Sequence, residues 1–92
     1  TIAQIYTFKL NDPSPNPFNA TTAISYELPE ASFVTLKVYD TVGRVVSTLV
    51  NGYRQAGSHE AMFDGSNLAS GVYLVRLEAG AFTAVRKMVL LK

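Results

Sequence analysis

At 92 residues, of which 48% are hydrophobic and 16% charged, the chain is long enough for one small core and too apolar to be a disordered segment. Its formal net charge is +1 and its eight Lys and Arg are scattered, which argues against a nucleic-acid partner. It has no cysteine, which excludes disulfides and thiolate metal sites, and no apolar run of the roughly 20 residues that a membrane span needs.

The first predicted strand covers residues 2–10. Its alternation puts three apolar side chains on one face: Tyr6, Phe8 and Leu10. Residues 11–17 end this strand, because proline cannot donate to a sheet ladder. We expect a rigid, extended connector at this point, followed by Phe18 as a plug at the end of the core.

Two strands with a period of two follow, over residues 23–28 and 33–39, separated by a turn at residues 29–32. Each turns apolar side chains to one face: Ile24, Tyr26 and Leu28 in the first, Val34, Leu36 and Val38 in the second. The second strand places Thr35 and Lys37 on its other face, as expected for a strand with one side in the core.

Glycines mark the turns in the middle of the chain. Gly43 fits the left-handed position of a hairpin loop that leads into a strand over residues 45–50. Residues 51–58 then form a longer polar loop. A short strand over residues 59–64 and a corner ending at Gly71 complete this part. The short strand turns two residues to one face: Ala61 and Phe63.

Residues 71–92 predict a β-hairpin. Gly80 lies between two apolar runs and can adopt the positive φ that a tight turn requires. The first arm turns three residues to one face: Tyr73, Val75 and Leu77. The second arm ends in residues 88–91, which are apolar on both faces. This tail therefore needs cover on both faces or offers one of them to a partner.

The seven predicted strands, with turn signals every 8 to 12 residues or so, indicate an all-β fold. We predict a seven-stranded antiparallel immunoglobulin-like β-sandwich over residues 6–92, preceded by an N-terminal extension over residues 1–5. No stretch of the sequence has the periodicity of a helix.

Several motifs occur in a specific order along the chain: Pro15, Asn16, Pro17, Phe18 and Asn19, then residues 21–22, 24–26 and 28–29, then residues 38–40 with Gly43, then residues 68–73, which include Gly71 and Tyr73, and finally the closing residues 87–92. In this order and spacing the chain resembles the C-terminal sorting domain of the type IX (Por) secretion system, over about residues 6–92. It is also similar to the immunoglobulin-like module of flagellar hook-capping proteins. One departure is Ala20, where the sorting domains often have a second proline.

The resemblance implies a non-catalytic module that directs a secreted protein through the type IX outer-membrane translocon to the exterior or the cell surface. In that family the translocon recognises the domain, the terminal strand is important for recognition, and a sortase-like peptidase usually removes the domain afterwards. We therefore predict a recognition tail made of Arg86, Lys87, Met88, Val89, Leu90, Leu91 and Lys92. One face of the tail fills the sandwich and the other is available for contact. Arg86, Lys87 and Lys92 frame it with positive charge.

An alternative function is a structural subunit that assembles with copies of itself into an extracellular filament or surface assembly. Its mechanism would be strand addition, in which the N-terminal segment pairs with an exposed sheet edge of a neighbour. The apolar residues of that segment are Ile2, Ile5, Tyr6, Phe8 and Leu10. This alternative implies a homo-oligomer.

Catalysis has little support in the sequence. His59 is the only histidine, and a Ser-His-Asp site would have to combine it with Asp40 or Asp64. A lone histidine at a strand end is most simply solvated, so we predict no enzyme. Asp64 and Asn67 lack the regular acidic spacing of a calcium loop, and we expect them to cap the corner instead. No cofactor and no metal ion are expected.

Overall fold

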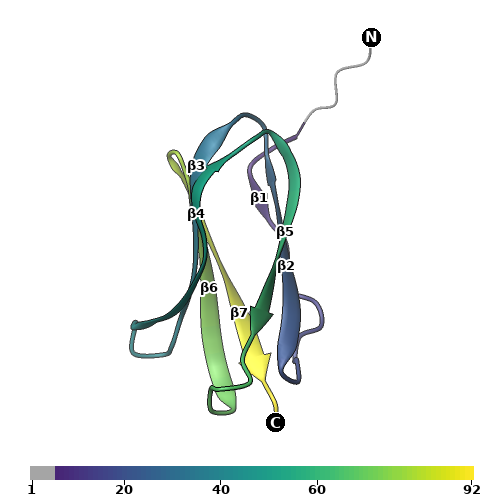
Figure 1. Ribbon diagram of the computed structural model, residues 1–92, viewed down its shortest axis with the longest axis vertical. Coiled ribbons are helices and arrows are strands. Elements are labelled where there is room, and N and C mark those ends of the chain that lie inside the picture. Colours follow the sequence, from purple (N-terminus) through teal and green to yellow (C-terminus); the bar gives the residue numbers. More distant parts are fainter. Residues whose placement is uncertain (1–5) are drawn as a thin grey trace.

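The computed structural model describes residues 6–92, and this part of the chain contains only β-strands and their connections (Figure 1). The seven strands are β1 (Lys9–Leu10), β2 (Thr21–Leu28), β3 (Ser32–Tyr39), β4 (Val45–Arg54), β5 (Gly57–Asp64), β6 (Gly71–Ala79) and β7 (Phe82–Leu90). They pair antiparallel into a three-stranded sheet, β1-β2-β5, and a four-stranded sheet, β4-β3-β6-β7. The predicted all-β sandwich is confirmed.

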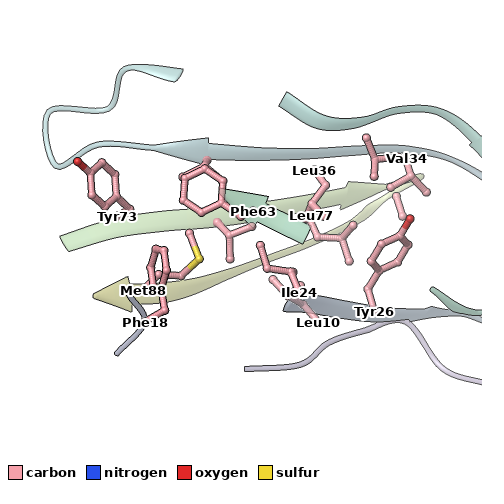
Figure 2. Close-up of a cluster of buried hydrophobic side chains, with 14 of the residues drawn as sticks. Leu10, Phe18, Ile24, Tyr26, Val34, Leu36, Phe63, Tyr73, Leu77 and Met88 are labelled. Atoms are coloured by element: carbon pink, nitrogen blue, oxygen red, sulfur yellow. The ribbon is translucent and has the colours of Figure 1, made fainter. Parts of the chain in front are cut away.

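The core lies between the two sheets, because the central strands alternate buried and exposed side chains. The inward faces carry the predicted apolar sets: Ile24, Tyr26 and Leu28 of β2, Val34, Leu36 and Val38 of β3, and Tyr73, Val75 and Leu77 of β6. Figure 2 shows Ile24 and Tyr26 of β2 facing Val34, Leu36 and Leu77 of the other sheet, and all nine residues belong to one core cluster. Burying each such side chain contributes about 1.5 to 3 kcal/mol, so the sandwich is held mainly by this layer.

Phe18 closes one end of the core, as predicted. Its side chain is 1% exposed and meets the Phe63 ring edge-on, with 5.9 Å between the ring centroids. In Figure 2, Phe18 lies at the same end of the core as Tyr73 and Met88. Leu68, in the corner before β6, packs partly buried against the same core. The end of the sandwich near the C-terminus is therefore sealed by aromatic side chains.

Two turns of the four-stranded sheet contain a glycine with a positive φ. Gly43 has a φ of +87°, and Gly80, the first residue of the two-residue loop between β6 and β7, has a φ of +59°. Both conformations are costly for other residues. Beside Gly43, the Asp40 carboxylate accepts hydrogen bonds from the backbone N–H groups of Arg44 and Val42 and from the Arg44 guanidinium. These donors lower the pKa of Asp40.

Tyr73 ties the start of β6 to the corner that precedes it. Its hydroxyl donates to the carbonyl oxygen of Ala69 at 2.7 Å, and the ring lies in the core. A tyrosine near the start of the sixth strand that bonds back to the preceding corner is the arrangement called the tyrosine corner in immunoglobulin-type sandwiches. This contact favours the immunoglobulin-like part of the fold prediction.

Several predicted boundaries differ from the structure. The strands predicted to begin at residues 23 and 33 begin at Thr21 and Ser32. Within residues 6–10 only Lys9–Leu10 are in a strand, where they pair with β2. The predicted loop over residues 51–58 is wrong: β4 continues to Arg54 and β5 begins at Gly57. The polar residues at the end of β4 still pair with β3, from Thr35↔Asn51 to Ser32↔Arg54. On an edge strand, backbone pairing needs no apolar side chains, so the hydrophobic pattern stops before the ladder does.

The predicted extended connector is also different in form. Residues 15–17 form a bend rather than a straight segment. Ala20, just beyond it, has a φ of +71°, which proline cannot adopt because its ring fixes φ near −65°. Alanine can adopt this φ at a cost in free energy, and glycine can adopt it without that cost.

We predict that Ala20→Gly stabilises the domain. A non-glycine residue in the left-handed region costs about 1 to 2 kcal/mol, and the extra chain entropy of glycine offsets about 0.5 to 1 kcal/mol of that gain. The free energy of unfolding, measured by urea denaturation, should rise by about 0.5 to 1 kcal/mol. Ala56→Gly is the matched control, because Ala56 is exposed and has no positive φ. That variant should lose stability, and equal effects of the two substitutions would contradict the assignment.

Candidate functional site

The predicted recognition tail is the end of β7, an edge strand of the four-stranded sheet. Met88 and Leu90 point into the core and are fully buried, whereas Val89 is half-buried and Leu91 is 55% exposed. Because successive side chains of a strand point to opposite faces, the apolar tail has one face inside the sandwich and one face outside. This is the division of the tail that the sequence pattern predicts.

The outer edge of the tail is occupied by a side chain from far away in the sequence. The Asn16 carboxamide donates from Nδ2 to the carbonyl oxygen of Lys87 at 2.8 Å, and its Oδ1 accepts from the backbone N–H of Val89 at 3.0 Å. A carboxamide offers one acceptor and a donor, as a peptide group does. Asn16 therefore pairs with β7 as one residue of a neighbouring strand would.

Backbone bonds continue this pairing to the end of the tail. The N–H of Phe18 donates to the carbonyl oxygen of Val89 at 2.9 Å, and the N–H of Leu91 donates to the carbonyl oxygen of Phe18 at 2.9 Å. This is a parallel bridge outside the named strands. The edge that β7 turns away from β6 is thus paired from the carbonyl oxygen of Lys87 to the N–H of Leu91.

We call residues 14–18 the strap, because they join the two sheets. At its start, Ser14 pairs with Ala23 of β2 through two backbone hydrogen bonds of 3.0 and 2.9 Å. The Thr22 hydroxyl donates to the carbonyl oxygen of Pro15 at 2.7 Å. The strap therefore leaves β2 of one sheet and ends on β7 of the other, which closes this side of the sandwich.

Lys92 is fixed against the corner that precedes β6. Its backbone N–H donates to the Ser70 hydroxyl at 3.0 Å, and its ammonium donates to the carbonyl oxygen of Ser66 at 2.7 Å. The Asp64 carboxylate accepts from the hydroxyl and the backbone N–H of Ser66. These two bonds lower the pKa of Asp64, and the Lys92 charge lowers it further. Asp64 thus caps the corner, as expected from the sequence.

The three cations of the tail have different environments. Arg86 lies 3.3 Å from the Asp12 carboxylate, and Lys92 is held at the corner. Lys87 is exposed, and its side chain takes part in none of the ion pairs found among residues 6–92. Of the three cations predicted to flank the apolar tail, Lys87 is the one on the outer face of β7.

The predicted strand-addition segment is partly used within the domain. Phe8 stacks on Phe82 with 5.3 Å between ring centroids, and Leu10 is buried in the core. Tyr6 is half-buried. Ile2 and Ile5 lie outside the described residues.

His59 is not placed for catalysis with either predicted aspartate. Its ring stacks on Tyr26, with 5.3 Å between centroids, and its Nε2–H donates to the carbonyl oxygen of Gln55 at 2.7 Å. Asp64 lies on the opposite face of β5, and Asp40 lies in a loop of the other sheet.

Two further site types have no candidate in the part of the chain that the structure describes. Residues 6–92 contain no cluster of three or more His, Cys, Asp or Glu arranged to hold a metal ion. The same residues form no helix with the length and apolar character needed to cross a membrane.

Sequence reasoning identified the tail and the strap motif but not the contact between them. Asn16 and its partners are 71 and 73 residues apart, and nothing local marks which strand an asparagine will pair with. The roles of Ser66 and Ser70 in fixing Lys92 were missed for the same reason. One signal was present in the sequence. Pro15 and Pro17 have no backbone N–H, so the Asn16 side chain between them is a candidate donor to a neighbouring strand.

We predict that Asn16→Ala lowers the free energy of unfolding by about 1 to 2 kcal/mol, because it removes two hydrogen bonds worth about 0.5 to 1.5 kcal/mol each. Asn16→Asp should also destabilise, since a carboxylate cannot donate to the Lys87 carbonyl oxygen. Urea denaturation measures both effects. Asn19→Ala, at an exposed neighbour, is the control and should change the stability by less than about 0.5 kcal/mol. Equal stability of the Asn16 and Asn19 variants would contradict the pairing.

Acid should weaken the corner that holds Lys92. The folded-state pKa of Asp64 lies below its unfolded value of about 3.9. The stability that it contributes is therefore present above pH 4 or so and is lost as the pH falls through the folded-state pKa. Asp64→Asn should lower stability at pH 7 and flatten its decline between about pH 5 and pH 2. A decline as steep as that of the wild-type domain would show that Asp64 is not involved.

Comparison with known families supports the resemblance found in the sequence. The family model described as "Secretion system C-terminal sorting domain" matches residues 14–91. No curated protein matches the chain. The family match begins in the strap and ends in the tail, so it contains both partners of the contact between Asn16 and β7. Because the match covers most of the chain, the protein belongs to the family of secretion system C-terminal sorting domains, which mark proteins for secretion to the cell surface or the extracellular space.

Proposed function

We propose that this domain is a non-catalytic sorting and anchoring module whose C-terminal strand is recognised by the type IX outer-membrane translocon. The protein that carries it is thereby exported to the exterior or the cell surface. The observation that carries the proposal is the form of the tail, which is fixed on its inner face and along its outer edge but leaves Val89 and Leu91 accessible from outside.

A tail held in this way suits recognition. Binding an ordered strand costs less conformational entropy than binding a frayed chain end, so more of the contact energy goes into affinity. The strap and the corner order residues 87–92 before any partner is present. The domain would then act by being bound, first by the translocon and afterwards by the sortase-like peptidase that such domains meet.

The self-assembly alternative has less support. Strand addition by the N-terminal segment would need apolar side chains that are free to leave the domain. Phe8 and Leu10 are instead engaged with Phe82 and with the core. We therefore place the filament or surface-assembly function second.

Export of a reporter tests the proposal directly. The full chain is fused to the C-terminus of a periplasm-directed fluorescent protein in a bacterium with an active type IX system, and the fluorescence outside the cells is measured. The reporter should leave wild-type cells and stay inside cells that lack the translocon. Equal export from both strains, or none from either, would overturn the proposed function.

We predict that Leu91→Asp reduces export with little effect on folding. Leu91 is 55% exposed, so the substitution removes an accessible apolar group while the core stays intact. Deleting residues 88–92 should also abolish export, but it removes the buried side chains of Met88 and Leu90 at about 1.5 to 3 kcal/mol each. The deletion alone therefore confuses recognition with folding.

The control for Leu91→Asp is Met62→Asp, because Met62 is 60% exposed on β5, in the other sheet from the tail. The melting temperature of each purified variant is compared with that of the wild-type domain. Export lost by Leu91→Asp and kept by Met62→Asp, at equal melting temperatures, is the expected result. Equal export by the two folded variants would remove the tail from recognition.

A further inference from the structure

The folded tail has one open side. Its inner face is buried through Met88 and Leu90, and one edge pairs with β6. Its other edge is filled by Asn16 and Phe18 between Lys87 and Leu91. What is left for a partner is the outer face, and on this face the tail is continuous with the neighbouring strand.

Apolar side chains from β6 extend this outer face. Val72 lies directly opposite Val89, and Leu74 lies opposite Lys87. These residues alternate with the buried Tyr73 and therefore point away from the core. Val72 is 39% exposed, and Leu74 is half-buried. The accessible side of the tail is therefore continuous with Val72 and Leu74 of β6, which lie outside the terminal residues 86–92.

A hollow lies beside these residues on the same face. Its volume is about 320 Å³, and it is lined by Tyr39, Leu74, Arg76 and Val85 and by three residues of the β3–β4 loop: Asp40, Thr41 and Gly43. Tyr39 pairs with Leu74 across β3 and β6, and Val85 pairs with Arg76 across β6 and β7. The hollow is largely apolar, so it fits an inserted apolar side chain.

The charge of the face is positive. Lys37 and Arg76 lie opposite each other on β3 and β6, and Lys87 stands next to Leu74. Two acidic residues lie here and each is paired: Glu78 of β6 is 3.7 Å from Arg76, and Asp40, which lines the hollow, is 2.9 Å from Arg44. Among residues 6–92, the ion pairs found include neither Lys37 nor Lys87. A partner with carboxylates around an apolar centre therefore complements it.

We infer that the tail is recognised through a composite face, formed by Val72 and Leu74 of β6 with Val85, Lys87 and Val89 of β7. The partner is a protein surface that inserts an apolar side chain into the hollow and sets carboxylates against Lys87 and Lys37. This inference rests on the proposed sorting function. It differs from recognition by strand addition, in which the partner would pair with the backbone edge of the tail and would first have to displace Asn16.

The reporter fusion of the full chain separates the two modes of recognition. Leu74→Thr and Val85→Thr remove apolar surface while keeping a residue that suits a strand. Each is expected to lower the exported fraction at limiting expression by about tenfold, as the loss of about one buried side chain implies. The control is Phe33→Thr, because Phe33 is 48% exposed on the outer face at the other end of the sheet, beside Tyr53. It should leave export unchanged.

Charge and edge variants complete the test. Lys87→Glu should reduce export, whereas Lys9→Glu, at an exposed position of the other sheet, should not. Asn16→Ala frees the outer edge of the tail. Recognition of the face predicts that this variant, where folded, exports no better than wild type, whereas strand addition predicts better export.

The outcomes distinguish this inference from the function on which it rests. A wild-type fusion that is not exported overturns both. If the wild-type fusion is exported, and Leu74→Thr, Val85→Thr and Lys87→Glu are exported equally well with unchanged melting temperatures, the composite face alone is overturned. Higher export by Asn16→Ala overturns it in favour of strand addition. If Leu74→Thr fails to fold, Val85→Thr decides, because Val85 is 46% exposed and lies outside the core.

Discussion

The backbone groups along an open sheet edge need partners, and in this domain that requirement falls on the terminal strand. An edge strand turns a row of N–H and C=O groups outward, where they attract other strands. From the carbonyl oxygen of Lys87 to the N–H of Leu91, these groups are satisfied by the Asn16 carboxamide and by the backbone of Phe18. With one edge on β6 and the other closed by this contact, the tail leaves only its outer face open to a partner.

The contact also couples distant parts of the chain. The strap is bonded to β2 at Ser14 and to β7 at Val89, so it links the two sheets where the core is closed by Phe18. The corner before β6 performs the corresponding task at Lys92. The last residues of the chain are therefore ordered only when both sheets are in place.

The sequence predicted those features that repeat locally. Alternation in β2, β3 and β6 identified the buried face of each strand, and the glycine between the last two strands identified their hairpin. The predicted loop after residue 50 was too long, because the last residues of β4 pair with β3 through their backbone although most of their side chains are polar. For the site, the apolar pattern of residues 88–91 predicted one buried and one accessible face. The partner of the tail edge was beyond reach, since that pairing is made by one side chain across more than seventy residues.

Hydrogen exchange along β7, followed residue by residue by NMR, tests the central claim most directly. The outward N–H groups along this edge belong to alternate residues: Thr83, Val85, Lys87, Val89 and Leu91. If the strap closes the tail, the amides of Val89 and Leu91 exchange as slowly as ladder amides of the strand, while those of Thr83, Val85 and Lys87 exchange rapidly. Rapid exchange at Val89 and Leu91 as well would show that the edge of the tail is open, and would contradict its closure by Asn16 and Phe18.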